Sequence, residues 1–197
     1  MTTANILAFA GSARRDSWNR KVLQIAVEGA REAGAEVTVA NLGDFPMPIY
    51  NADWHQENGV PPAMRELRKL MMAANGLLIA SPEYNTSITP LLKNTIDWVS
   101  SPVKGHPEWT DGMKSSRGKV VGVLSASPGA LGGLRSQSHL APLLINLECW
   151  LAPKNFALGR AGDAFDSEGA LKDERARHSV QAVIDQVIWA AARLQPA

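Results

Sequence analysis

Residues 5–19 read NILAFAGSARRDSWN, an apolar run that passes directly into a polar loop and the start of a helix. The apolar run is typical of a strand buried in a parallel sheet, and helical periodicity follows the loop. Such a corner directs backbone N–H groups and the positive end of a helix toward one point, which suits a phosphate. Ser12, Ser17 and Asn19 can add neutral hydrogen bonds, and Arg14 a charge-assisted one. The alternative is a capped helix with solvated arginines.

Strands and helices alternate along the rest of the chain. Further apolar runs predict four more strands, at residues 36–40, 76–80, 119–124 and 155–158. Helical periodicity between the runs predicts an α/β fold, with a parallel sheet covered by helices on both faces. Five strands suit a flavodoxin-like three-layer sandwich with the strand order 2-1-3-4-5. The length of 197 residues predicts one domain over residues 1–197.

Three loops rich in Ser, Gly, Pro and Asn follow the first, third and fourth predicted strands. Ligands of open α/β sheets bind beyond the carboxyl ends of the strands, at the switch point of the strand order. We therefore expect the three loops to meet in one crevice. The second loop, residues 81–85, predicts a rigid wall of backbone amides beside a flat ligand, with Tyr84 shielding it, although a plain turn is an equal alternative. In the third loop, Gly132 and Gly133 permit close backbone approach to a ligand.

Composition and residue spacing argue against several other function classes, including nucleic-acid binding, membrane-surface binding and metal-dependent catalysis. The net charge of +1 indicates no general attraction to nucleic acid or to a membrane surface. Cys149 is the only cysteine, which excludes an intrachain disulfide and fits a reducing, cytoplasmic location. Its apolar surroundings predict a packing residue. The four histidines are scattered without metal-ligand spacing, so we expect no metal site, and no Gly-x-Ser-x-Gly nucleophile motif occurs.

Four motifs carry a family resemblance. In chain order they are GSxRxxSxN from Gly11, PEYN from Pro82, LKNTIDW from Leu92 and GxxGGxR from Gly129. Together they resemble the NAD(P)H-dependent FMN reductases, a family that includes flavodoxin-like quinone, chromate and azo-dye reductases. One departure is that Ala141 follows His139-Leu140, where many relatives have an arginine.

The resemblance implies a set of cofactor-binding residues. The FMN phosphate would be held by the first loop, and the isoalloxazine ring would lie between the second and third loops. Position by position, the implied residues are Ser12, Arg14, Ser17, Trp18 and Asn19 for the phosphate, Pro82, Glu83, Tyr84 and Asn85 for one side of the ring, and Ser125, Ala126 and Ser127 for the other. No catalytic side chain is implied, because the flavin carries the chemistry.

The same resemblance implies an activity, in which hydride passes from NAD(P)H through FMN to quinones or similar small acceptors by a ping-pong mechanism. Three alternatives remain open: a reductase that supplies reduced FMN to a partner, a non-enzymatic electron carrier like flavodoxin, and a non-flavin protein that binds a phosphate-bearing ligand. A near-neutral charge balance counts against the carrier.

Two further expectations concern packing. The segment 45–60, with Pro46 and Pro48, predicts a loop that lies over another part of the molecule. The helix after Asn85 has a second apolar face that includes Trp98, which predicts a homodimer or tetramer with this helix in the interface. The alternative is that the loop formed by residues 105–112 folds back over Trp98.

Overall fold

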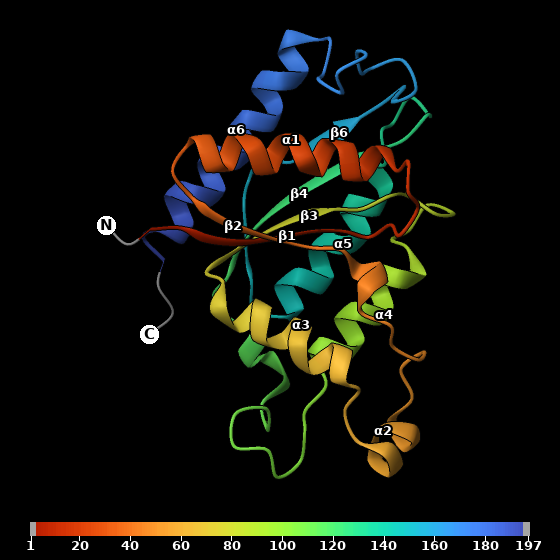
Figure 1. The fold of residues 1–197 in the computed structure, drawn as a ribbon, viewed down its shortest axis with the longest axis vertical. Helices are drawn as coiled ribbons and strands as arrows, with labels where there is room; N and C mark the ends of the chain where they lie inside the picture. The colour runs from red at the N-terminus through yellow and green to blue at the C-terminus, as the bar shows by residue number, and fades with distance from the viewer. Residues whose placement is uncertain (1–2, 195–197) are drawn as a thin grey trace.

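The computed structural model describes residues 3–194 and contains a parallel sheet (Figure 1). Its strands are β1 (Asn5–Ala10), β2 (Glu36–Ala40), β3 (Gly76–Ala80), β4 (Val120–Ala126), β5 (Trp150–Leu151) and β6 (Phe156–Leu158). The order β2-β1-β3-β4-β5 confirms the predicted flavodoxin-like topology. The strand order reverses direction between β1 and β3, which makes the carboxyl ends of these strands the switch point of the sheet.

The edge of the sheet beside β4 differs from the prediction. The fifth strand expected at residues 155–158 is present as β6, but a second short strand, β5, also pairs with β4. β5 pairs with the start of β4 at Val120 and Val121, and β6 pairs with its end from Leu124 onward. Pro153 lies between the two short strands and has no backbone N–H to donate, so a continuous ladder cannot form there.

Helices cover both faces of the sheet (Figure 1). The helices are α1 (Trp18–Glu32), α2 (Ala52–Asn58), α3 (Pro62–Ala73), α4 (Pro90–Val99), α5 (Leu134–Asn146) and α6 (Glu174–Ala191), with single 3-10 turns at Leu42–Asp44 and Gly112–Ser115. α1 and α6 pack on one face, and α3, α4 and α5 on the other, each layer with its own buried apolar cluster. Over residues 3–194, the helices lack the length and apolar character that crossing a membrane requires.

The segment 45–60 is only partly a loop, since it contains α2. The side chain of Asn51 caps this helix by accepting a hydrogen bond from the backbone N–H of Trp54. The prediction that the segment lies over another part of the molecule is confirmed, because the indole Nε1 of Trp98 donates to the carbonyl of Pro48 at 2.7 Å.

The second apolar face of α4 is therefore covered by the chain itself. Trp98 is fully buried, and the rings of Tyr50 and Trp54 approach its ring edge-on at centroid distances of 5.0 and 5.8 Å. The expectation that Trp98 needs a second subunit to cover it is wrong, because sequence periodicity does not reveal which distant segment covers a helix. A homodimer remains a prediction, on other grounds given below.

Candidate functional site

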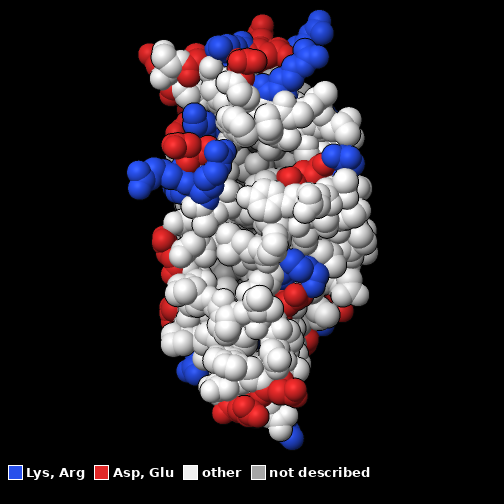
Figure 2. Space-filling view, turned by 90° about the vertical axis from the view of Figure 1, so that its right-hand side faces the viewer, with Lys and Arg blue, Asp and Glu red and all other residues white. Residues whose placement is uncertain are grey.

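The three predicted loops meet at the carboxyl ends of β1, β3 and β4. They enclose a groove of about 180 Å³, which we call the carboxyl-edge groove. The residues that line it are Ser12, Arg14, Ser17, Trp18, Asn19, Pro82, Glu83, Tyr84, Ala126, Ser127 and Pro128. Figure 2 shows this side of the molecule, where most of the surface is uncharged and the largest group of basic side chains lies toward one edge.

The first loop presents an open helix N-terminus to the groove. Ser17 is the N-cap residue of α1, but its side chain makes no capping hydrogen bond, although it is 3% exposed. The first N–H groups of a helix have no partner within the helix, so donors at this end of α1 are available to an anion. Arg14 adds a positive charge here, and its guanidinium lies 5.1 Å from the centroid of the Trp18 ring.

Asn19 joins the first loop to the third. Its amide Nδ2 donates to the carbonyl of Ala126 at 2.8 Å, and its Oδ1 accepts from the N–H of Ala126 at 2.9 Å. Both atoms are buried, so this pair fixes the distance between the start of α1 and the end of β4. The structure thus gives Asn19 a bridging role inside the groove wall in addition to its place in the lining.

The second loop is a tight turn held in an unusual backbone conformation. Tyr84 and Ser87 exchange two backbone hydrogen bonds, at 2.9 and 3.0 Å, around the central residues Asn85 and Thr86. Both central residues have positive φ angles, 48° and 68°, as a type I′ turn requires. Thr is rarely found in this region, so the surrounding contacts must hold the turn in place.

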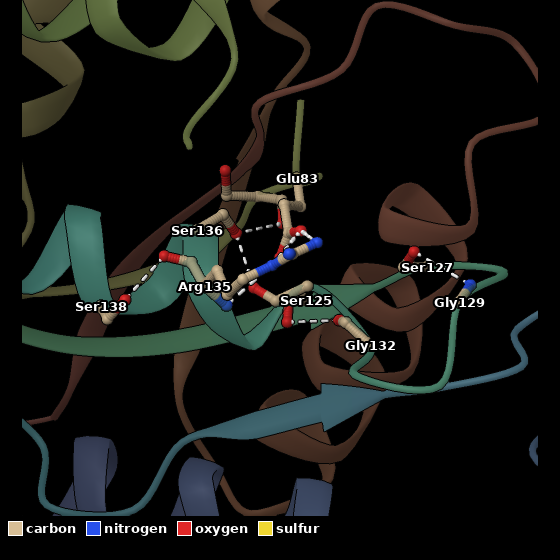
Figure 3. Close-up of polar contacts among 10 residues, drawn as sticks. Glu83, Ser125, Ser127, Gly129, Gly132, Arg135, Ser136 and Ser138 are labelled. Carbon is tan, nitrogen blue, oxygen red and sulfur yellow. Dashed lines mark hydrogen bonds and ion pairs between the residues drawn. The ribbon is translucent and has the colours of Figure 1, made fainter. Parts of the chain in front are cut away.

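A carboxylate in the second loop caps α5 (Figure 3). Glu83 accepts from the backbone N–H of Arg135 at 3.2 Å and from its Nε at 2.7 Å, and it also pairs with Nη2. The N-cap of α5 is Gly133, which has no side chain to fill this role. The hydrogen bonds from Arg135 hold the pKa of the Glu83 carboxyl below its usual range, so the pair is ionic at neutral pH.

The third loop is packed tightly behind the groove. Ser125 is fully buried, and its hydroxyl donates to the carbonyl of Gly132 at 2.7 Å (Figure 3). The same hydroxyl accepts from the side-chain amide of Gln137. A Cβ at Gly132 would lie 2.6 Å from the carbonyl carbon of Leu158, and its φ of +63° also favours glycine. The backbone of Gly132 therefore lies against residues of β6, inside the wall of the groove.

The structure brings together nearly all of the predicted site residues. Asn85 and Ser125 do not line the groove: Asn85 forms the tip of the turn, and the side chain of Ser125 lies in the wall behind it. Pro128 lines the groove in addition to the predicted set.

Two positioning contacts were not predicted from the sequence. Thr89 donates from its hydroxyl to the carbonyl of Gly11 at 2.7 Å, and Nδ1 of His139 lies 3.0 Å from the hydroxyl of Ser87. These partners are 78 and 52 residues apart in the chain, and no local pattern marks such pairs.

Cys149 and Lys119, which lie outside the groove, have shifted pKa values that follow from burial. Burial raises the pKa of the Cys149 thiol to about 12, which keeps it protonated at neutral pH. Burial also lowers the pKa of the neighbouring Lys119 to about 8. Within residues 3–194, no three His, Cys, Asp or Glu side chains are grouped in a way that could hold a metal ion.

Comparisons with known proteins show which family the chain resembles along most of its length. The family model described as NADPH-dependent FMN reductase matches residues 4–163. An NAD(P)H-dependent FMN reductase of Pseudomonas aeruginosa is 37% identical over 177 residues, which are 89% of each chain. An NAD(P)H:quinone oxidoreductase of Solanum tuberosum is 34% identical, over 91% of this chain and 88% of that one.

A solved structure agrees with the fold. FerB of Paracoccus denitrificans, described as a flavoenzyme NAD(P)H:(acceptor) oxidoreductase, superimposes with a TM-score of 0.78. The alignment covers 98% of this chain and 99% of that chain at 23% sequence identity. At this identity the superposition establishes a shared fold.

Proposed function

Because this chain belongs to the NADPH-dependent FMN reductase family, we propose that it transfers electrons from NAD(P)H through FMN to quinones or similar small acceptors. The relatives named as quinone oxidoreductases support the choice of acceptor. The observation that carries the proposal is the meeting of three loops around an open helix N-terminus at the switch point of the sheet.

The residues of the groove fit the phosphate of FMN. Ser17 occupies the cap position without using its hydroxyl on its own helix, so that hydroxyl and the free N–H groups of α1 can turn to a ligand. Arg14 adds a cation at the same corner, and Ser12 a nearly buried hydroxyl. We propose that these three side chains and the end of α1 bind the phosphate.

The other two loops would orient the ring. When bound, FMN supplies the redox chemistry, since it can accept two electrons from one substrate and pass them to another. Tyr84 and the backbone on either side of it form one wall, and the backbone of Ala126 and Ser127 forms the other. The Glu83–Arg135 pair and the Asn19–Ala126 pair hold these walls at a fixed separation.

A groove of about 180 Å³ is smaller than the roughly 300–1,000 Å³ of sites that enclose a whole ligand of cofactor size. A bound FMN would therefore extend beyond the groove, with part of its ring accessible. We propose that NAD(P)H and the acceptor use this accessible face in turn, which corresponds to ping-pong kinetics.

The test begins with the purified protein. We expect it to be yellow, to retain about one FMN per chain through gel filtration, and to oxidise NADH or NADPH when a benzoquinone is supplied. Initial rates at several quinone concentrations should give parallel lines in double-reciprocal plots. Intersecting lines would contradict the shared face, and loss of FMN on gel filtration with rapid reduction of added FMN would favour a flavin-supplying reductase.

We also propose a homodimer that uses the face formed by α4 and α5. An open groove of about 520 Å³ lies there, lined by Ile88, Pro90 and Leu143 among others. Nearby apolar side chains are exposed, including Tyr84 at 52% and Ile145 at 63%. Sedimentation at micromolar concentration should show a dimer that Ile145→Lys weakens, and a monomeric wild type would end this proposal.

A further inference from the structure

A second hollow lies away from the carboxyl-edge groove, between α2, the start of α3 and the segment 101–111, toward the bottom of Figure 1. We call it the α2 cavity. Its volume of about 590 Å³ is within the range of small-molecule sites, and it shares no lining residue with the groove. The proposed electron transfer does not use it.

The outer wall of the α2 cavity is an ordered loop tied to the core by one buried arginine. Arg68 on α3 is fully buried, and its guanidinium donates to the carbonyls of Ser101 at 2.8 Å, Asp111 at 2.9 Å and Gly112 at 3.3 Å. Within this loop, the backbone N–H of Val103 donates to the carbonyl of Trp109 at 2.7 Å. The Arg68 hydrogen bonds attach both ends of the loop to α3, and the Val103–Trp109 hydrogen bond joins its two arms. The loop therefore forms a fixed wall of the cavity.

The charged groups in the lining are all basic. Arg65 and Lys104 approach the α2 cavity from α3 and from the loop, and the imidazoles of His55 and His106 approach it from α2 and from the loop. No Asp or Glu is among the residues that line it. The Nε of Arg65 donates to the carbonyl of Val60, which leaves the terminal guanidinium nitrogens without a hydrogen-bonding partner among the described residues. The two permanent cations, Arg65 and Lys104, together with the absence of a carboxylate from the described lining, favour an anion.

The rest of the wall is aromatic and apolar. The His106 ring stacks on the Trp109 ring with their centroids 4.1 Å apart and their planes 7° apart. Val60 and Val103 add aliphatic surface beside this stack. The backbone N–H of Glu108 donates to Nδ1 of His106 at 3.2 Å, so a neutral His106 carries its proton on Nε2 and can donate.

The same wall holds an unsatisfied polar group. The indole Nε1 of Trp109 is buried and has no hydrogen-bond acceptor anywhere in residues 3–194. A buried donor without an acceptor costs free energy, but this atom has almost no accessible surface, so it adds no contact for an occupant of the cavity.

We propose that the α2 cavity binds a small aromatic carboxylate. The basic groups would meet the carboxylate, and the wall formed by Val60, Val103 and the stacked His106 and Trp109 would meet the ring. The dimensions of the cavity favour a small molecule, and its combination of cations with flat apolar surface favours an aromatic anion over an inorganic one.

Benzoate is the probe, titrated calorimetrically into the FMN-loaded protein. We expect saturable binding of one benzoate per chain without a change in the visible flavin spectrum. Benzamide, which has the same ring without the charge, and inorganic phosphate should each bind at least about tenfold more weakly, because each lacks one of the two recognition elements. The proposal would be overturned if benzamide or phosphate bound as tightly as benzoate. It would also be overturned if benzoate changed the visible absorption spectrum of the flavin.

Two single variants locate the binding. Arg65→Gln and Lys104→Gln should each weaken benzoate binding by about tenfold, the loss expected for one charge-assisted hydrogen bond. Lys104 is exposed on the loop, so its replacement leaves the fold intact even if that of Arg65 does not. Lys69→Gln, on the same helix as Arg65 but outside the lining, is the matched control and should leave benzoate affinity unchanged. Unchanged affinity in both test variants would overturn the proposal.

Discussion

The carboxyl-edge groove and the α2 cavity are two hollows of one molecule, built in different ways. The walls of the groove are the ends of β1, β3 and β4, so sheet topology places them. The walls of the α2 cavity are a seven-residue helix, the start of α3 and a loop, and side chains such as Arg68 hold the loop in place. The difference teaches that a site at strand ends can be located from the order of strands, whereas a site between loops depends on individual long-range contacts.

The largest expected effect tests whether the two hollows are independent. Arg68→Met should leave three loop carbonyls without donors and lower the free energy of unfolding by about 3 kcal/mol or more. Because the groove lies elsewhere, FMN affinity should change by less than about threefold. Urea denaturation and flavin titration measure the two quantities, with Lys69→Gln as a surface control. A loss of FMN affinity comparable to the loss of stability would show that the hollows are coupled.

The second prediction tests the groove directly. Arg14→Ala combined with Ser17→Ala removes a charge-assisted and a neutral hydrogen bond, of order 2–4 kcal/mol together. FMN affinity should fall by about two orders of magnitude or more, with little change in unfolding. Arg15→Ala, at a neighbouring exposed arginine outside the lining, is the matched control for charge. If fluorescence titration finds the double variant as tight as wild type, the phosphate binds elsewhere.

A third, smaller effect concerns the carboxylate that joins two walls of the groove. The folded-state pKa of Glu83 is lowered by Arg135, so its stabilisation is present at neutral pH. This stabilisation should be lost as the pH falls from about 4.5, the ordinary pKa of a glutamate side chain, through the lowered pKa of Glu83 in the folded protein. The melting temperature of wild type should therefore fall more steeply with acid than that of Glu83→Gln. Parallel pH profiles for the two proteins would show that the ion pair contributes nothing to stability.

The smallest effect is expected at Cys149, outside both hollows. The raised pKa of its half-buried thiol, about 12, predicts slow alkylation by iodoacetamide at neutral pH. Cys149→Ser should leave quinone reductase turnover within about a factor of two, since the thiol contacts neither hollow. A loss of activity with FMN still bound would give this thiol a role in the reaction.

Much of the groove was predictable because the positions of the apolar strands and the composition of the loops that follow them are local properties of the sequence. The loops at residues 11–19 and 81–85 follow buried apolar runs, and parallel strands bring such loops to one edge. What the sequence does not reveal is which way a side chain faces within a loop. Ser125 and Ser127 are two residues apart, yet Ser125 is buried in the wall while Ser127 lines the groove.

The rest could not be predicted because it depends on tertiary contacts. The exposure of Trp98 was misjudged because Pro48 and Tyr50, which cover it, lie about fifty residues earlier in the chain. The pairing of Glu83 with Arg135 and the anchoring of the loop by Arg68 also join distant residues. A single sequence carries no signal for such pairs, since their charges look like ordinary surface residues.

The interrupted edge beside β4 has a consequence for behaviour in crowded solution. A long, regular edge strand presents a row of free N–H and C=O groups that can template a strand from another molecule, a route to aggregation. Here β5 and β6 are two and three residues long, and Pro153 separates them. A strand from another molecule could not form a continuous ladder of backbone hydrogen bonds along this edge, because the edge is interrupted between β5 and β6. The break between β5 and β6 thus disfavours growth of the sheet along this one edge.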